Sequence, residues 1–195
     1  MAKKNVKTEC SGMEWSQFLY LIERLKKANE YQFMLFIAIG GYCGLRVGDL
    51  LRLCWIDIVD QDCIEVVEGK TGKNRKVSIN LSLKEIIAHC YQNSKAGNKP
   101  VLASNVFVNR TGNVFSRQYI NRRLHLIFQK NKLKLQNGSS HVLRKTFGKR
   151  VFEMNDNSEA ALILLSSIFN HSSTAITRRY IGLSQSQIQD VYLNL

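Results

Sequence analysis

Apolar residues recur at helical spacing through most of the chain, and this pattern predicts a mainly helical protein. Ser11 followed by Glu14 is typical of a capping box, and the periodic stretch behind it predicts a helix from about residue 12 to Asn29. Tyr31–Tyr42 is apolar almost all round, which is typical of a buried helix, and glycines punctuate its end. A further helix is expected to begin near Val47.

The pattern then changes to a short β region. Cys63–Val67 and Lys76–Ile79 are rich in β-branched residues, and Glu68–Arg75 between them has the glycines and asparagine of a hairpin turn. Val106–Val108 is a candidate third strand. The predicted fold class is therefore mainly α with a small antiparallel β-sheet.

Helical periodicity returns in the second half of the chain. Apolar residues near residue 120 share one helical face and are expected to be buried: Ile120, Leu124, Ile127 and Phe128. Helices are predicted at residues 81–91, 139–154, 158–168, 173–181 and 185–194.

The charge balance points to a polyanionic partner. Lys and Arg total 28 against 15 Asp and Glu, a formal net charge of +13. Such an excess favours nucleic acid, through steering and counterion release, although RNA or an acidic membrane surface would also fit. Apolar residues make up 45% of the chain, which is enough for a core and excludes general disorder.

Several classes of protein are excluded. The longest nearly apolar run, Phe33–Leu45, is too short to span a bilayer, and no apolar signal core follows Met1. The cysteines are odd in number and form no Cys-x-x-Cys pair, so neither a disulfide framework nor a zinc site is expected. Reduced cysteines indicate a protein of the cytoplasm. The cysteines are Cys10, Cys43, Cys54, Cys63 and Cys90.

Polar residues occur where core residues would be expected. Arg46 follows the buried helix, and Asp49 three residues later would share its face in a helix, as a local ion pair or as a support for Arg46. His141 and Arg144 also lie three residues apart, a spacing that suits an oxyanion site but equally a solvated basic face.

Two further segments carry candidate chemistry. His171 precedes a predicted helix N-terminus, which favours anions, and Tyr180 follows nine residues later. Lys70 lies in the hairpin turn. Taken singly, a tyrosine on an amphipathic helix is usually a core residue and a turn lysine is usually solvated.

In combination, these segments resemble the tyrosine recombinase and phage integrase family. The matching motifs are Gly44-Leu-Arg46, Lys70 in Gly-Lys-Thr-Gly, His141-Val-Leu-Arg144, and Asn170-His-Ser-Ser with Tyr180. They agree with the family in order and spacing over roughly residues 12–195. The family usually has Gly at the position of Asn170, and Asn also tolerates positive φ.

The resemblance implies the family's catalytic-domain fold, of the DNA breaking-rejoining type, and its chemistry. Tyr180 would attack the scissile phosphate to give a 3′-phosphotyrosine and a free 5′-hydroxyl, and Asp49 would support Arg46. The implied catalytic set is Arg46, Lys70, His141, Arg144, His171 and Tyr180. Lys73 is a second candidate for the hairpin lysine. Because the arginines and lysine supply positive charge, no metal or other cofactor is expected.

Double-stranded DNA is the implied partner. Basic residues outside the catalytic set are expected to contact it, mainly through phosphates: Lys73, Arg75, Lys76, Arg117, Arg122, Arg123, Lys145 and Lys149. Residues 184–195 resemble the C-terminal helix that the family exchanges between protomers, which predicts a tetramer on paired sites. A bacterial or phage-encoded, nucleoid-associated protein without a membrane anchor is expected.

The domain division is also an expectation. Residues 1–11 read as a flexible basic tail and residues 12–195 as the catalytic domain, without the family's N-terminal core-binding domain. The chain would then be an excised domain or a naturally short recombinase. Two other functions stay open: a type IB topoisomerase-like relaxing enzyme, and a DNA-binding module that has lost catalysis.

Overall fold

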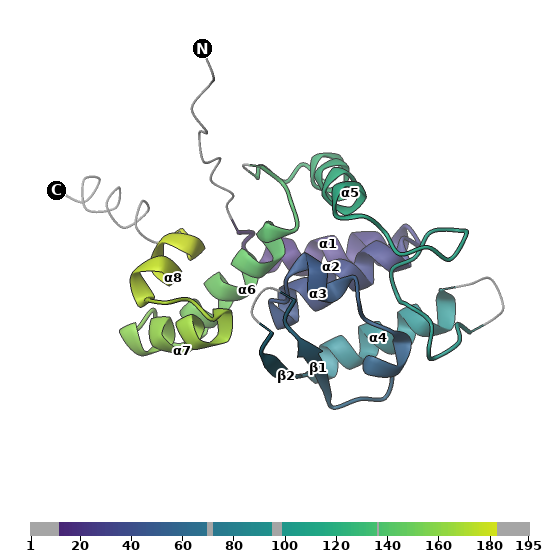
Figure 1. Ribbon diagram of the computed structural model, residues 1–195. Coiled ribbons are helices and arrows are strands. Elements are labelled where there is room, and N and C mark those ends of the chain that lie inside the picture. Colours follow the sequence, from purple (N-terminus) through teal and green to yellow (C-terminus); the bar gives the residue numbers. More distant parts are fainter. Residues whose placement is uncertain (1–11, 70–71, 95–98, 136, 183–195) are drawn as a thin grey trace, which may run out of the picture.

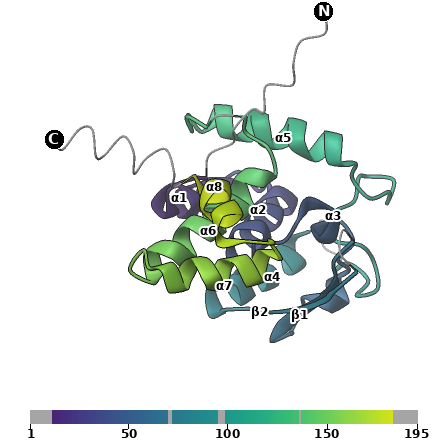
Figure 2. The ribbon, with the colours of Figure 1, turned by 60° about the vertical axis from the view of Figure 1, so that its left-hand side comes forward.

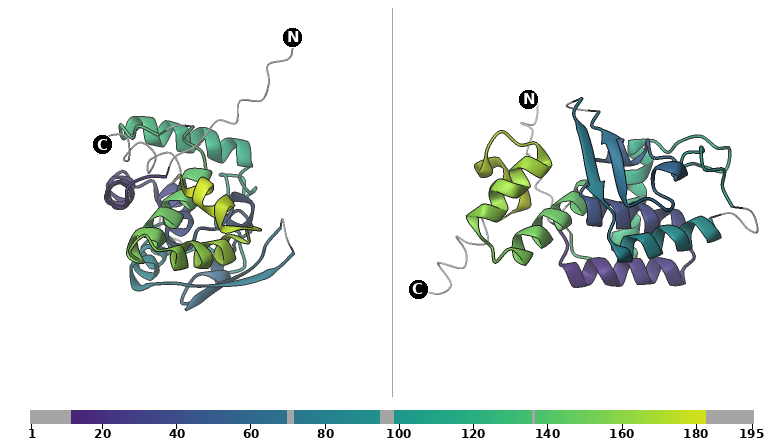
Figure 3. Two further views of the ribbon diagram at one scale, coloured as in Figure 1. Left: turned by 90° about the vertical axis from the view of Figure 1, so that its left-hand side faces the viewer. Right: turned by 90° about the horizontal axis from the view of Figure 1, so that it is seen from below.

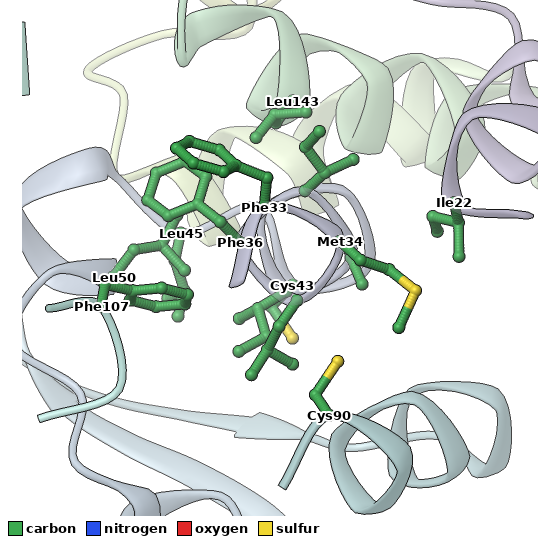
Figure 4. Packing of buried hydrophobic residues seen from close by; sticks show 14 of the residues in the cluster. Ile22, Phe33, Met34, Phe36, Cys43, Leu45, Leu50, Cys90, Phe107 and Leu143 are labelled. Carbon is green, nitrogen blue, oxygen red and sulfur yellow. The ribbon is translucent and has the colours of Figure 1, made fainter. Parts of the chain in front are cut away.

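Helix α2 (Tyr31–Cys43) runs through the centre of the domain, as its apolar composition predicts. A computed structural model describes residues 12–69, 72–94, 99–135 and 137–182. Helices α1 (Trp15–Lys27), α4 (Leu81–Asn93) and α6 (His141–Met154) pack around α2. In Figure 4, which looks along α2, Ile22, Cys90 and Leu143 approach it from three sides. Burial of this helix on all sides makes it the organising element of the core.

Helix α1 begins later than predicted. Its first residue is Trp15, and the N-cap is Glu14, whose N–H donates to Oε1 of Gln17 at 3.2 Å. The expected cap at Ser11 is therefore wrong, because the Glu14–Gln17 pair already caps the first turn. Just before it, the N–H of Met13 donates to Oγ1 of Thr146 on α6 at 2.9 Å, which ties this end of the chain to the site-bearing helix.

The sheet among the described residues is a single antiparallel hairpin of β1 (Cys63–Val67) and β2 (Asn74–Ser78). It stands beside α3 (Val47–Leu50) and α4 in Figures 1 and 3. The register pairs Cys63 with Ser78 at its open end. The fold class, mainly α with a small antiparallel sheet, is confirmed.

The predicted third strand at Val106–Val108 is wrong. This segment makes only isolated bridges, Cys54 with Asn105 and Val108 with Val114. Its apolar residues serve the core instead, because Phe107 is fully buried with its ring centroid 5.1 Å from that of Phe36. Apolar residues in a short run do not distinguish a strand from a core-packing loop.

The last helices form a second, smaller cluster. Helices α7 (Glu159–Phe169) and α8 (Thr174–Ile181) pack on each other and on the end of α6. They lie at the left of Figure 1, on the other side of the molecule from α4, and come to the front in Figure 2. Their buried residues include Leu165 and Phe169, and they meet Phe152 of α6. The segments that carry the predicted site residues thus come from both clusters, and α6 bridges them.

The remaining expectations are mixed. Helix α5 (Arg117–Lys130) buries the face predicted for it. The predicted tail at 1–11 and helix at 185–194 lie outside the described residues. Among the described residues, no helix alone has the length and apolarity of a membrane span, whereas α7 and α8 together, bent by 92°, reach those of a broken span.

Candidate active site

A pocket of about 610 Å³ opens between α3, the start of α6 and α8. Its walls carry the predicted residues Arg46, His141, Arg144, His171 and Tyr180. Lys70 lies outside the described residues, although its neighbour Gly69 lines the pocket. The structure therefore brings together side chains from distant parts of the chain.

The two arginines converge on one backbone oxygen. Nη2 of Arg46 and Nη2 of Arg144 each donate to the carbonyl oxygen of Phe169 at 3.1 Å. Nη1 of Arg144 also donates to the carbonyl oxygen of Gly44. Gly44 ends α2 in the left-handed region with φ 59°, and an added Cβ would lie 2.6 Å from the Phe147 ring. A side chain at this position would therefore disturb the turn that leads into Arg46.

Arg144 lines the pocket but is almost fully buried. Its guanidinium carbon lies 4.2 Å from the centroid of the Phe169 ring, a distance suited to a cation–π contact. Burial is the main cause that lowers the pKa of Arg144 to about 10. At neutral pH the guanidinium is still charged, so this helix presents a fixed cation to any anion in the pocket.

Glu68, not Asp49, is the carboxylate that contacts Arg46. Oε2 of Glu68 lies 2.5 Å from Nη1 of Arg46, and its side chain is 3% exposed. The predicted ion pair between Asp49 and Arg46 is wrong. Arg46 is the N-cap of α3, with an extended backbone, and does not share a helical face with Asp49. Sequence reasoning missed Glu68. The alternation of Ile64 and Val66 on the inner face of β1 was the signal that could have found it.

Asp49 holds the hairpin instead. Its Oδ1 accepts a hydrogen bond from the backbone N–H of Gly69 at 3.1 Å and another from Nη2 of Arg52 at 2.8 Å. Arg52 also donates to the carbonyl oxygen of Val67 at 2.6 Å. These contacts tie α3 to the end of β1, directly before Lys70 in the sequence.

His171 and Tyr180 lie against each other in the pocket. Their ring centroids lie 5.3 Å apart in an edge-to-face arrangement, and Phe169 lies 5.4 Å from Tyr180. Nδ1 of His171 is 2.9 Å from Oγ1 of Thr177, a fully buried residue that sequence reasoning missed. A threonine three residues before the tyrosine gave no signal by itself.

The turn into His171 is made by Asn170. It ends α7 in the left-handed region with φ 53°, as expected for the position where the family usually has Gly. Its Oδ1 accepts a hydrogen bond from Nζ of Lys73 at 3.1 Å, so the turn before β2 is joined to the turn before His171.

His141 is the first residue of α6, and the preceding residue is fixed by a hydrogen bond from its N–H to Oδ1 of Asn121 at 3.0 Å. The imidazole is exposed on the pocket wall, yet the surrounding protein and then the charges of Lys145 and Arg144 lower its pKa. The neutral form, which can accept a proton, is thus favoured at neutral pH.

This arrangement agrees with comparisons to known proteins. Residues 12–187 match the phage integrase family. The probable integrase/recombinase YoeC of Bacillus subtilis (strain 168) is 31% identical over 171 residues, covering 86% of each chain. The chain belongs to the phage integrase family. It carries the catalytic domain of a tyrosine-type site-specific recombinase.

More distant members of the integrase family share the fold. Tyrosine recombinase XerC of Xanthomonas campestris pv. campestris is 26% identical over 76% of this chain and 44% of XerC. XerA recombinase has a TM-score of 0.71 at 22% identity, covering 95% of this chain and 65% of XerA. XerH bound to its difH substrate has a TM-score of 0.72 at 18% identity, covering 98% and 55%. The chain spans less than two thirds of these three proteins.

The residues predicted to contact DNA are spread unevenly over this integrase domain. Arg117 lines the pocket, and Nζ of Lys145 lies 5.3 Å from the Tyr180 ring centroid. Arg75 points inward, where Nη2 donates to the carbonyl oxygen of Cys43 at 3.0 Å, and this position does not suit the predicted phosphate contact. The others are exposed or half-buried, several of them beside acidic residues: Lys73, Lys76, Arg122, Arg123 and Lys149.

Proposed function

We propose that Tyr180 is the nucleophile with which this integrase domain cleaves and rejoins DNA. The observation that carries the proposal is the convergence of Arg46 and Arg144 on one oxygen in a pocket also lined by His171 and Tyr180. Guanidinium groups fixed in this way suit the non-bridging oxygens of a phosphate, where charge develops during the reaction.

The proposed step balances without an external energy source. The Tyr180 oxygen forms a bond to phosphorus while the bond to the 5′ oxygen breaks, which leaves a 3′-phosphotyrosine. His141 takes the phenolic proton, and Lys70 gives a proton to the departing 5′ oxygen. His171 donates a hydrogen bond to the phosphate. Religation reverses each transfer, since the phosphotyrosine bond conserves the energy of the phosphodiester bond that was broken.

Positive charge for this step comes from side chains. Among the described residues, no group of three or more His, Cys, Asp or Glu side chains is placed to hold a metal ion. Arg46, Arg144 and Lys70 would together offset the developing negative charge, so we propose a metal-independent reaction without a cofactor.

Duplex DNA is the proposed substrate, as a difH duplex is for XerH. The net charge of +13 supports this, and Arg117 and Lys145 at the pocket are the first candidates for phosphate contacts. We further propose that residues 184–195 dock on a neighbouring protomer to form a tetramer on paired sites. The protein would act on the nucleoid, in the cytoplasm of a bacterium.

A nicked suicide substrate tests the nucleophile. Duplexes drawn from inverted repeats beside the gene are incubated with the full chain, and a covalent adduct is sought on a denaturing gel. Wild type should form the adduct, Tyr180→Phe should not, and Tyr20→Phe on the exposed face of α1 should. An adduct with Tyr180→Phe would reject this nucleophile. Site-independent plasmid relaxation would indicate a topoisomerase, and tight binding without cleavage a silent DNA-binding module.

A further inference from the structure

Glu68 is a buried carboxylate placed between two guanidinium groups. Its Oε2 lies 2.5 Å from Nη1 of Arg46 and its Oε1 lies 3.7 Å from Nη1 of Arg75. The side chain is 3% exposed, although carboxylates are rarely buried so fully unless they are paired. Such burial requires a structural or functional reason.

The backbone of Glu68 is fixed by the hairpin that follows it. Its N–H donates to the carbonyl oxygen of Lys73 at 2.9 Å, and its own carbonyl oxygen accepts from Gly72 at 2.8 Å. The next residue, Gly69, donates its N–H to Asp49 at 3.1 Å. The backbone position from which the Glu68 side chain reaches Arg46 is therefore set by the hairpin turn.

The contacts of Arg46 with the protein determine which of its N–H groups can donate to a ligand in the pocket. Nη1 faces Glu68 and Nη2 donates to the Phe169 carbonyl oxygen at 3.1 Å, so both ends of the guanidinium are held by the protein. A guanidinium carries five N–H groups in a rigid plane, and fixing two ends fixes the direction of the rest.

We propose that Glu68 is a positioning residue that aims Arg46 at the scissile phosphate and couples it to the hairpin that carries Lys70. This inference rests on the proposed function. The carboxylate also separates the positive charges of Arg46 and Arg75, which would otherwise repel each other in a partly desolvated site. The hairpin and the arginine then reach their working positions together.

In a different role for Glu68, removing its charge would have the opposite effect on the cleavage rate. If Glu68 occupied Arg46 in place of the phosphate and left when DNA bound, removing its charge would speed cleavage. The burial of Glu68 argues for positioning, since a carboxylate that left Arg46 would be a buried charge without its ion pair.

Kinetics separate the two roles. Two quantities are measured for wild type, Glu68→Gln and Glu68→Asp. One is the single-turnover rate of adduct formation at saturating DNA, and the other is the dissociation constant for DNA. Glu65→Gln is the matched control, because Glu65 lies three residues before Glu68, in β1, with its side chain 71% exposed and paired to Lys76. Glu68→Gln should slow cleavage roughly 10²-fold, because Arg46 would no longer be held in its working position. The affinity for DNA should change little. Glu68→Asp should recover part of the rate.

A cleavage rate of Glu68→Gln equal to or above that of wild type would overturn the proposal, as would a loss confined to affinity.

A second measurement needs neither cleavage nor a substitution at Glu68. Rotation about the Nε–Cζ bond of Arg46, followed by NMR in the free wild-type protein, should be slow compared with that of exposed Arg24. Fast rotation would also reject the role of Glu68. If wild type forms no adduct but this rotation is slow, the proposed function fails and the positioning of Arg46 stands.

Discussion

Oγ1 of Thr177 lies 2.9 Å from Nδ1 of His171 and is out of reach of solvent, so one ring nitrogen of the histidine has a fixed partner inside α8. A partner on Nδ1 sets the tautomer and orientation of the imidazole. Because Thr177 and Tyr180 lie on the same helix, the orientation of His171 depends on the segment that carries the nucleophile.

Replacing Thr177 by Val should impair His171 without moving α8. Val has nearly the shape of Thr but cannot hydrogen-bond, so His171 would lose its alignment toward the phosphate. We expect adduct formation to slow by 10- to 100-fold, roughly what one hydrogen bond of about 1.5–3 kcal/mol to a charged group contributes. Thr177→Ser keeps the hydroxyl and should retain most of the rate. Equal rates for the Val variant and wild type, with both folded, would contradict this role.

Asn170 should tolerate Gly better than Ala. Its φ of 53° lies in the left-handed region, which costs an ordinary residue roughly 1–2 kcal/mol. Asn170→Ala should therefore lower the free energy of unfolding by about that amount, whereas Asn170→Gly avoids this strain. Urea denaturation measures both. Equal losses for the two variants would show that the hydrogen bond to Lys73, not the backbone, sets the cost.

The cleavage rate should depend on the protonation of His141. The surrounding protein, which partly desolvates the exposed imidazole, and then the charges of Lys145 and Arg144 lower the pKa of His141 from 6.5, so the neutral form predominates at pH 7. The base form is lost as the pH falls through this lowered pKa, and the single-turnover rate should drop only below about pH 6.5. Lys145→Met should move the midpoint of the pH–rate profile upward, and Lys145→Arg should not. A profile unaffected by either substitution would argue against His141 as the base.

Binding to DNA should weaken steeply with salt. If six to ten phosphates are contacted, affinity should fall about 10³- to 10⁵-fold between 50 and 200 mM salt. Arg117→Ala, at the pocket wall, should reduce the slope of log affinity against log salt by about 0.9. Arg24→Ala on α1 is the control and should leave the slope unchanged. A slope insensitive to Arg117 would remove it from the interface.

The sequence by itself predicted the features that depend on neighbouring residues. Helical periodicity identified the buried α2, and glycine and Asn preferences located the turns at Gly44 and Asn170. The motifs picked out five residues that line one pocket. The helix, each turn and each single motif depend on residues within a few positions of one another, where backbone preference and side-chain spacing act directly.

Only the tertiary structure decided which groups meet. It placed Glu68 rather than Asp49 against Arg46, turned Arg75 inward, and used Val106 and Phe107 for the core instead of a strand. These outcomes depend on how the β1–β2 hairpin folds back onto α3 and how distant segments fill the core. Contacts between residues far apart in sequence are set by the packing of the whole domain, which no local pattern records.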